Sequence, residues 1–350
     1  MKLAHVRERS APAGAPWRLA AALPDGRWLD LEGARRRLNA RDRGLAHNDP
    51  LFRGPVTTLD AHLAAGRRVE ALRAILEPFL TRPDLVPPAD EPDDETGSDL
   101  ALVEGEVRFG PPVLRPPSIR DFYAFEGHVR TMWQRRDQEV PEIWYRIPIF
   151  YFSNVSEVRG PTDPVWAPRG SSELDYELEV AALVDTPARD LEPAVAEQVI
   201  GGYTIFNDWS ARDLQREETQ VRLGPAKGKD FASSFGPWLV TPDELEDARS
   251  GKGYALALTA EVNGQETSRG TWAEIQFSFA EMLARASADA QLVPGDLVGS
   301  GTVGTGCLLE VREGTLGRYL EPGDRVTLRV DRLGELTSEV VDRPGAGRTP

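Results

Sequence analysis

A short segment of the chain alternates apolar residues with the acidic residues Glu173, Asp175, Glu177 and Glu179. On a β-strand, alternate side chains share a face, so this pattern predicts one apolar face and one face of four carboxylates. Runs of charge are most often solvated, and a half-exposed strand with its acidic face in water is the simpler interpretation of this segment. The alternative is a site for a hard divalent cation, because Mg²⁺, Mn²⁺ and Ca²⁺ prefer carboxylate oxygens.

A second segment adds another carboxylate and a guanidinium group. We expect Asp208 to end a strand, and Ser210 with Asp213 to begin a helix in the manner of a capping box. Arg212 and Gln215 then lie on one side of that helix. A carboxylate between a strand and a helix N-terminus is a common functional location. The alternative for Asp208 is an Asx turn that satisfies backbone donors.

A third segment places a histidine near another acid. Asp121 and His128 are seven residues apart in the segment Ile119–Trp133, whose pattern predicts a helix. Positions seven apart on a helix return to within about 20° of one another, so both side chains would face the same cavity. A lone histidine is more often structural than catalytic, but the other three histidines all lie in the first 62 residues. His128 is therefore the candidate base.

Together these segments resemble the fumarylacetoacetate hydrolase family, and the resemblance runs from about Pro117 to Val330. Its longest and most specific motif is the run from Asn207 to Gln215. The other matching pieces are Asp121-Phe122-Tyr123 with His128, Leu174 to Glu179, Leu223-Gly224-Pro225 through Gly228-Lys229, and Gly301-Thr302-Val303 with Glu310.

The resemblance implies a metal site formed by Asp121, Glu177, Glu179 and Asp208. Four carboxylates without a histidine ligand select Mg²⁺, with Mn²⁺ or Ca²⁺ as alternatives, over zinc. The resemblance also implies that His128 is the general base and that Glu310 orients this histidine and raises its basicity. Lys229 is implied as an electrostatic stabiliser or proton donor. The residues implied around the substrate or the metal are Tyr151, Arg212, Gln215 and Thr302.

By the same resemblance we expect a divalent-metal-dependent hydrolase that cleaves a carbon–carbon bond in a small 1,3-dicarbonyl or 2-oxo acid, of the fumarylacetoacetate or acylpyruvate type. The alternatives are a decarboxylase, hydratase or isomerase of a 2-oxo dicarboxylate on the same scaffold, and a non-catalytic ligand-binding relative. Thr219 stands where the enzyme that names the family has a substrate-contacting tyrosine, which leaves the particular substrate open. The family commonly forms homodimers, so we expect a homodimer.

The elements that must position these residues are mostly strands after residue 100. Strand patterns cover Tyr145–Phe152, Leu174–Val184, Tyr203–Asp208, Trp238–Thr241, Tyr254–Val262, Leu297–Ser300, Cys307–Val311 and Arg325–Val330. Helical patterns are few and cover Ile119–Trp133, Glu192–Ile200, Ala211–Glu218 and Ser278–Ala288. Many strands without regular strand–helix alternation predict an α+β, mostly β fold. With the resemblance, we expect a mixed β-sheet roll with a small N-terminal α+β domain.

A stretch rich in proline and acid divides the chain. Residues 83–99 contain four prolines and seven acidic residues but no basic residue, a composition that argues against packed structure. We therefore predict a small N-terminal domain at residues 1–90, a linker at 91–100 and a catalytic domain at 101–350. In the N-terminal domain, Pro24-Asp25-Gly26 predicts a hairpin between Trp17 and Leu31.

The overall composition excludes several classes of partner. The chain has 41 basic and 56 acidic residues and a net charge of −15, which argues against binding to nucleic acid or an anionic membrane. No apolar run reaches the ~18 residues of a membrane span, and the first residues lack a signal-peptide core. The single cysteine, Cys307, favours a reducing compartment, so we expect a cytoplasmic protein. Its apolar neighbours predict a core position rather than a nucleophile.

Overall fold

The computed structural model describes residues 1–12, 14–42, 44–86 and 100–345, and the predicted linker at 91–100 lies outside them apart from Leu100. The strands are β1 (Lys2–Glu8), β2 (Arg18–Ala22), β3 (Arg27–Asp30), β4 (Ala101–Val103), β5 (Val107–Phe109), β6 (Ile119–Phe122), β7 (Phe150–Ser153), β8 (Val158–Arg159), β9 (Leu174–Asp175), β10 (Leu178–Val184), β11 (Ile200–Asp208), β12 (Ser210–Ala211), β13 (Ser233–Val240), β14 (Arg249–Ser250), β15 (Gly253–Tyr254), β16 (Ala257–Val262), β17 (Gln265–Thr271), β18 (Leu297–Gly299), β19 (Arg325–Val330) and β20 (Gly334–Glu339). The α-helices are α1 (Leu31–Arg41), α2 (Leu45–Asn48), α3 (Pro50–Arg53), α4 (Leu59–Ala64), α5 (Arg73–Thr81), α6 (Glu126–Gln134), α7 (Pro193–Ala196), α8 (Arg212–Glu218), α9 (Phe279–Ser287) and α10 (Leu308–Val311).

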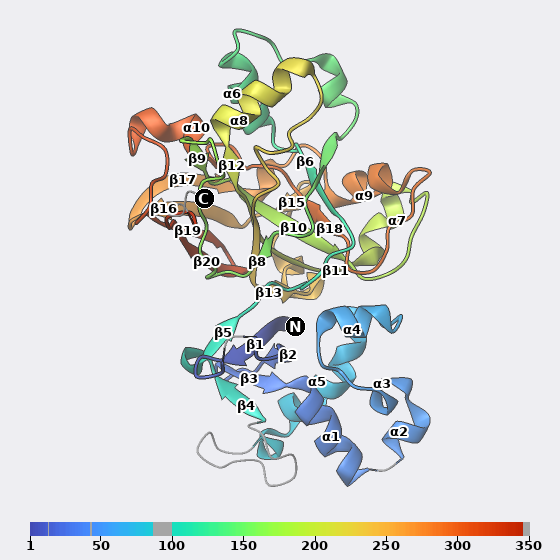
Figure 1. Cartoon of the computed structure of the whole chain (residues 1–350). Helices are drawn as coiled ribbons and strands as arrows, with labels where there is room; N and C mark the ends of the chain where they lie inside the picture. Colours follow the sequence, from blue (N-terminus) through green and yellow to red (C-terminus); the bar gives the residue numbers. More distant parts are fainter. Residues whose placement is uncertain (13, 43, 87–99, 346–350) are drawn as a thin grey trace.

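Two sheets face each other in the larger part of the molecule, one mixed and one antiparallel (Figure 1). The first runs β4-β3-β2-β1-β13-β11-β10-β18-β6-β7, with β5 beside β1 and β8 beside β13, and the second runs β17-β16-β19-β20. Apolar residues from both sheets form one core, in which Val180 and Ile205 of the first pack with Leu258 and Leu328 of the second. The predicted α+β, mostly β fold is confirmed.

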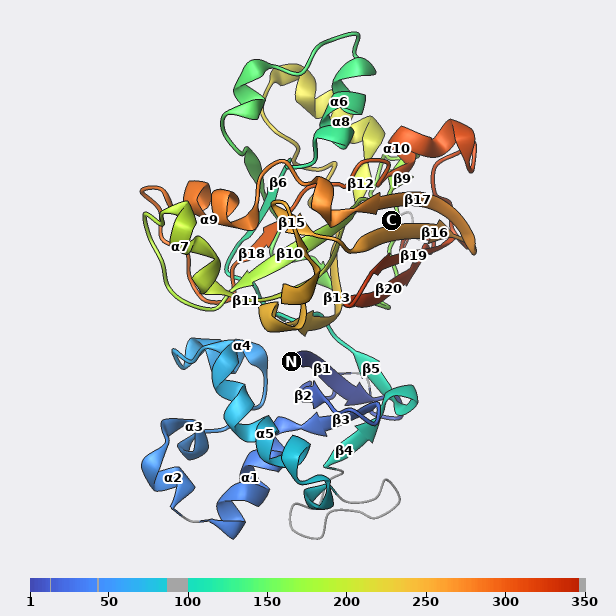
Figure 2. The ribbon, with the colours of Figure 1, turned by 180° about the vertical axis from the view of Figure 1, so that it is seen from behind.

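The N-terminal strands continue the first sheet. β1 pairs antiparallel with β13, with Lys2 opposite Val240 and Leu3 opposite Leu239. β4 and β5, which follow the predicted linker, pair with β3 and β1. Helices α1–α5 gather around these strands at the end of the molecule opposite α6 and α8, as Figures 1 and 2 both show. Leu29, Leu76 and Leu239 share one apolar cluster, so the two parts share a sheet and a core. The division of the chain at 91–100 stays a prediction.

Some local expectations are confirmed and others are wrong. The hairpin between Trp17 and Leu31 forms from β2 and β3. The segment Ile119–Phe122, predicted as the start of a helix, is strand β6, because it is inserted between β18 and β7 and pairs with both. Pairing on two sides overrides the local helical pattern, and α6 begins only at Glu126. Leu308–Val311, predicted as part of a strand, is the short helix α10.

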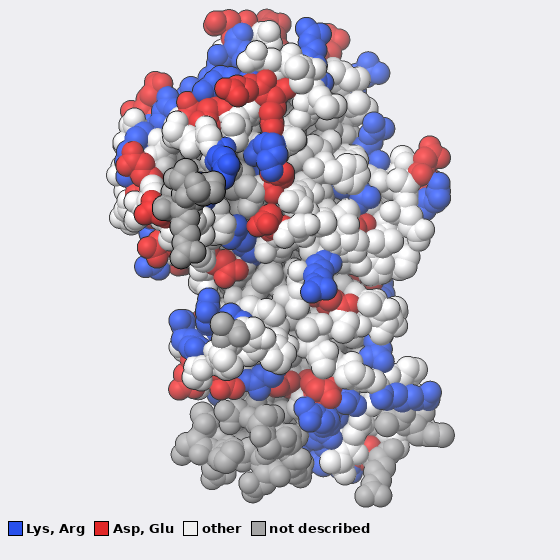
Figure 3. All heavy atoms as spheres, viewed as in Figure 1, with Lys and Arg blue, Asp and Glu red and all other residues white. Residues whose placement is uncertain are grey.

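Among the described residues, no helix has both the length and the apolar character that crossing a membrane requires. On the face shown in Figure 3, the acidic and basic side chains of the described residues are interspersed.

Candidate active site

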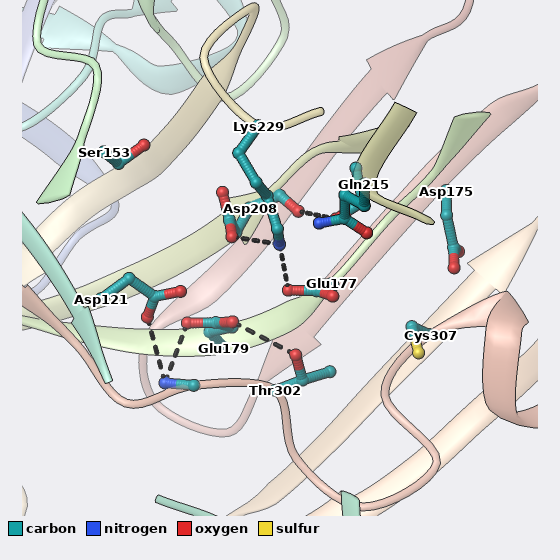
Figure 4. A network of polar contacts seen from close by, with 12 residues as sticks. Asp121, Ser153, Asp175, Glu177, Glu179, Asp208, Gln215, Lys229, Thr302 and Cys307 are labelled. Atoms are coloured by element: carbon teal, nitrogen blue, oxygen red, sulfur yellow. Dashed lines mark hydrogen bonds and ion pairs between the residues drawn. The ribbon is translucent and has the colours of Figure 1, made fainter. Parts of the chain in front are cut away.

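Four carboxylates converge where strands of the large sheet end (Figure 4). Asp121 lies on β6, Glu177 directly precedes β10, Glu179 lies on β10 and Asp208 ends β11. All four residues are buried, with exposed fractions of 5% or less, and one oxygen from each lies within 4.8 Å of the others. The interpretation of the acidic segment as a solvated strand face is therefore wrong, and the convergence predicted for the four acids is present.

The predicted strand Leu174–Val184 is interrupted, and the interruption separates Asp175 from the four carboxylates. β9 pairs with β12, and β10 begins only at Leu178. Asp175 accepts hydrogen bonds from Arg212 Nε at 2.8 Å and from the backbone N–H groups of Leu308 and Leu309 at 2.8 and 2.9 Å. Asp175 thus fixes Arg212 and the start of α10.

Lys229 and Arg212 compensate part of the negative charge. Lys229 Nζ lies 2.6 Å from Glu177 Oε2 and also contacts Asp208 Oδ2, and Arg212 Nη1 donates to Glu177 Oε1 at 2.6 Å. Burial favours a neutral carboxyl, but Lys229 and Arg212 outweigh it and hold the pKa of Glu177 below its usual value. Burial also opposes the charge of Lys229, but Asp208 and Glu177 hold its pKa above its usual value.

Among the described residues of the site, neither Asp121 nor Glu179 forms an ion pair with a positively charged side chain. Burial raises the pKa of both well above the usual value, and the neighbouring carboxylates raise it further. The N–H of Gly301 donates to both, at 3.2 Å to Asp121 and 3.0 Å to Glu179. Among the described residues, the buried Asp208 Oδ1 has no hydrogen-bond partner. A site short of positive charge, with an unpaired buried oxygen and an all-oxygen donor set, fits a hard divalent cation.

A histidine–glutamate pair lies beside the carboxylates. His128, in the first turn of α6, contacts Glu310 Oε1 of α10 through Nδ1, and Glu310 Oε2 accepts the N–H of Thr305 at 2.8 Å. With its Nδ1 hydrogen directed to Glu310, the ring keeps a lone pair on Nε2 that can take a proton. Asp121 and His128 both line the cavity, as expected, but from a strand and the following helix rather than from one helix.

A cavity of about 730 Å³ opens in front of these groups. The remaining predicted site residues that line it are Tyr151, Arg212, Gln215, Lys229 and Thr302. Tyr151 Oη donates to Asp208 Oδ2 at 2.6 Å, and Gln215 Oε1 accepts from Arg212 Nη1 at 3.1 Å. Thr302 Oγ1 donates to Glu179 Oε1 at 3.3 Å. The apolar part of the wall includes Met132, Trp133, Ile149, Phe150 and Leu309. Three further arginines also line the cavity, Arg135, Arg136 and Arg216.

Sequence reasoning missed some of the residues that hold the site in place. Asn207 Oδ1 accepts the N–H of Glu177 at 3.0 Å and fixes the interruption before β10; its place next to Asp208 was the available signal. The predicted capping box is wrong: Ala211 caps α8 without a side-chain bond, and Asp213 accepts instead from Ser171 and Ser172.

Known proteins resemble this chain in sequence and in fold. A family model described as the C-terminal part of fumarylacetoacetate (FAA) hydrolase matches residues 118–341. The 2,4-didehydro-3-deoxy-L-rhamnonate hydrolase of Sphingomonas sp. (strain SKA58) is 31% identical over 251 residues, which cover 70% of this chain and 81% of the relative. Fumarylacetoacetase of Oryza sativa subsp. japonica is 28% identical over 399 residues, which cover 94% and 89%. The structure of 5-carboxymethyl-2-hydroxymuconate delta-isomerase from Mycobacterium smegmatis has a TM-score of 0.61 at 22% identity, covering 98% of this chain and 100% of that one, which shows a shared fold.

Proposed function

The chain belongs to the fumarylacetoacetate hydrolase family, and on that premise we propose that it is a divalent-cation-dependent enzyme that hydrolyses a carbon–carbon bond of a small oxo acid. The expected substrate is a 1,3-dicarbonyl or 2-oxo acid of the fumarylacetoacetate or acylpyruvate type. The observation that carries this proposal is a histidine–glutamate pair beside four buried carboxylates, with His128, Asp121, Glu177 and Glu179 lining one cavity. Binding alone needs no positioned base, which argues against a non-catalytic relative.

The four buried carboxylates of Asp121, Glu177, Glu179 and Asp208 would hold the cation, and their oxygens suit Mg²⁺, with Mn²⁺ or Ca²⁺ as alternatives. When bound, such a cation polarises a carbonyl group and stabilises enolate charge. Lys229 keeps its proton because two carboxylates surround it. It therefore acts as a fixed positive charge beside the reacting carbons rather than as a base.

The chain's own residues supply the proton transfer and the orientation. His128 takes a proton from water through Nε2, Glu310 stabilises the charged ring through Nδ1, and the hydroxide attacks the carbonyl carbon. The adjacent carbon–carbon bond then breaks, and the carbon that leaves takes the proton that His128 had accepted, which returns the imidazole to its neutral form. Arg212 Nη2 is buried and without a hydrogen-bond partner among the described residues. Since Arg212 lines the cavity, it is the donor for a substrate carboxylate, with Tyr151, Gln215 and Thr302 around it.

The test is turnover of acylpyruvates, fumarylacetoacetate and 2-oxo dienoates with Mg²⁺ or Mn²⁺ present. On the substrate that is turned over, His128→Gln loses about 10²- to 10⁴-fold in kcat, while calorimetry finds the cation affinity nearly unchanged. Glu310→Gln loses less, because Glu310 orients the base without meeting the substrate. Glu177→Ala loses both cation binding and turnover. Full turnover by His128→Gln would contradict the water-activation step.

The alternative on the same scaffold is a decarboxylase, hydratase or isomerase of a 2-oxo dicarboxylate. One observation supports isomerisation as the alternative: the Mycobacterium smegmatis protein of the same fold is described as an isomerase. Product analysis separates the reactions: hydrolysis gives two acids or an acid and a ketone, whereas isomerisation gives one product of unchanged mass.

We also propose that the enzyme is a cytoplasmic homodimer. The support for the compartment is the single, buried cysteine, and the support for the dimer is the family. Light scattering of the purified protein gives the mass of the assembly directly, and a mass of one chain would contradict the dimer.

A further inference from the structure

A second group of metal-ligating side chains lies next to the four carboxylates. His128, Cys307 and Glu310 each offer one ligand atom within 4.8 Å of the others. Cys307 Sγ is 3.7 Å from Glu310 Oε1, the oxygen that His128 Nδ1 contacts. The side chains of His128 and Glu310 are 4% and 3% exposed, and Cys307 is completely buried. The proposed mechanism uses His128 and Glu310 but gives Cys307 no role.

This donor set is chemically different from the four carboxylates. It offers one imidazole nitrogen, one sulfur and one carboxylate oxygen, which together suit Zn²⁺ or Cd²⁺ rather than Mg²⁺. Bond lengths of about 2.0 Å to nitrogen or oxygen and about 2.3 Å to sulfur place tetrahedral ligand atoms roughly 3.3–3.5 Å apart. The 3.7 Å between Cys307 Sγ and Glu310 Oε1 is close to that spacing. His128 Nδ1 and Glu310 Oε1 are in hydrogen-bond contact, so these two atoms must move apart to bind the same ion. Three protein ligands leave a fourth position, and His128 borders the cavity from which a cation would enter.

The charges near Cys307 do not oppose a cation. Arg212 is the nearby positive group, but it is paired with Asp175 at 2.8 Å and with Glu177 at 2.6 Å. Burial raises the pKa of the Cys307 thiol well above its usual value, so binding must displace the thiol proton into solvent. Zinc-type cations do this to a coordinating thiol, and their binding therefore strengthens as the pH rises.

We propose that His128, Cys307 and Glu310 form a second cation site, selective for thiophilic divalent cations such as Zn²⁺ and Cd²⁺, and that its occupation inhibits the enzyme. A cation on Nδ1 takes the place of the hydrogen bond to Glu310, and the ring hydrogen then resides on Nε2. The imidazole has no lone pair left to accept a proton from water. The inhibitory part rests on the proposed function of His128, whereas the binding part does not.

The test uses Cd²⁺ and the full-length protein with Mg²⁺ in excess, so that the all-oxygen site is supplied with its preferred ion. Cys307 is the single cysteine of the sequence, so the ultraviolet charge-transfer band of a Cd²⁺–thiolate bond reports on this site alone. We expect the band to saturate at one Cd²⁺ per chain. Cys307→Ser, checked for native fold by circular dichroism, loses the band. Glu310→Gln keeps the thiol, and its Cd²⁺ affinity falls by about 10- to 100-fold.

Inhibition is measured in parallel, with each variant normalised to its own rate without Cd²⁺. In the wild type, the Cd²⁺ concentration that halves the rate should equal the one that half-saturates the band. In Cys307→Ser, that concentration rises by at least 10-fold. Absence of the band, or equal inhibition of wild type and Cys307→Ser, would overturn the site, because the inhibiting ion would then occupy the four carboxylates. If no substrate is turned over, the proposed function fails, but the charge-transfer band still shows whether Cd²⁺ binds at Cys307.

Discussion

Removing one charge from the carboxylate cluster should stabilise the cation-free protein and weaken its response to a cation. Glu179 is the position to change, because it is completely buried and has no positive partner among the described residues of the site. Two unit charges at 4.8 Å, the upper limit of the separation of these oxygens, repel by about 3.5 kcal/mol at an effective dielectric constant of about 20. The raised pKa values of Asp121 and Glu179 mean that a bound proton relieves part of this repulsion. We therefore expect Glu179→Gln to gain about 1–3 kcal/mol in the free energy of unfolding without cation.

The assay is denaturant unfolding of wild type and variant, first with a chelator and then with excess Mg²⁺. At a Mg²⁺ concentration 100 times the dissociation constant, the wild type gains about 2.7 kcal/mol, and Glu179→Gln gains less because a ligand is lost. The order of stability should reverse between the two conditions. Asp296→Asn is the matched control, because this buried carboxylate is paired with Arg120 and Ser118 instead. It should destabilise the protein in both conditions and keep the full Mg²⁺ response.

The reasoning would be refuted if Glu179→Gln were less stable than wild type without cation and gained as much from Mg²⁺. Glu179 would then be a structural acceptor for Gly301 and Thr302 rather than part of a cation site.

Two further predictions concern backbone space and pH. A Cβ at Gly299 would overlap Asp121 Oδ1, so Gly299→Ala should weaken cation binding by about 10-fold or more, as the loss of a residue that supports a ligand does. Calorimetry measures the cation affinity. Gly105→Ala, where a Cβ meets open space, is the control and should bind the cation normally. His5 accepts the N–H of Leu59 through Nε2 at 2.9 Å, and burial lowers its pKa. Its contribution to stability is therefore complete above the unfolded pKa of about 6.5 and is lost as the pH falls through the folded value, by at most about 1.4 kcal/mol per pH unit. Unfolding between pH 7.5 and 5.5 should show a shallower slope for His5→Gln, and equal slopes would contradict this role.

Those parts of the site that depend on short-range spacing along the chain could be predicted from the sequence. The alternate spacing of Glu177 and Glu179 predicts two carboxylates on one side of the backbone, and both belong to the cluster, with Glu177 directly before β10 and Glu179 on it. Asp208 ends its strand as expected. The family resemblance supplied the pairing of His128 with Glu310, which lie 182 positions apart. No local pattern connects residues that far apart.

What the sequence could not supply depends on long-range pairing. Asp121 was expected on a helix, but β18 and β7 pair on either side of it and make its segment a strand. Asp175 belongs to the same acidic alternation as Glu177, yet the interruption before β10 and the N–H groups of α10 direct it to Arg212. Cys307 was expected in a strand of the core; it is buried, but its neighbour Glu310 belongs to the site. These positions are set by tertiary contacts rather than by spacing.

The most direct test of the central claim is the rate at which chelator-treated protein turns over the oxo acid identified as its substrate, measured as Mn²⁺ is added back. We expect almost no turnover without cation and a rate that rises in proportion to bound Mn²⁺ until one ion is held per chain. Asp208→Asn should need far more Mn²⁺ for the same fraction of its maximal rate, because it removes a carboxylate oxygen from the cluster. Full turnover by the cation-free protein, unchanged on addition of Mn²⁺, would contradict the assignment of the four carboxylates as a functional cation site.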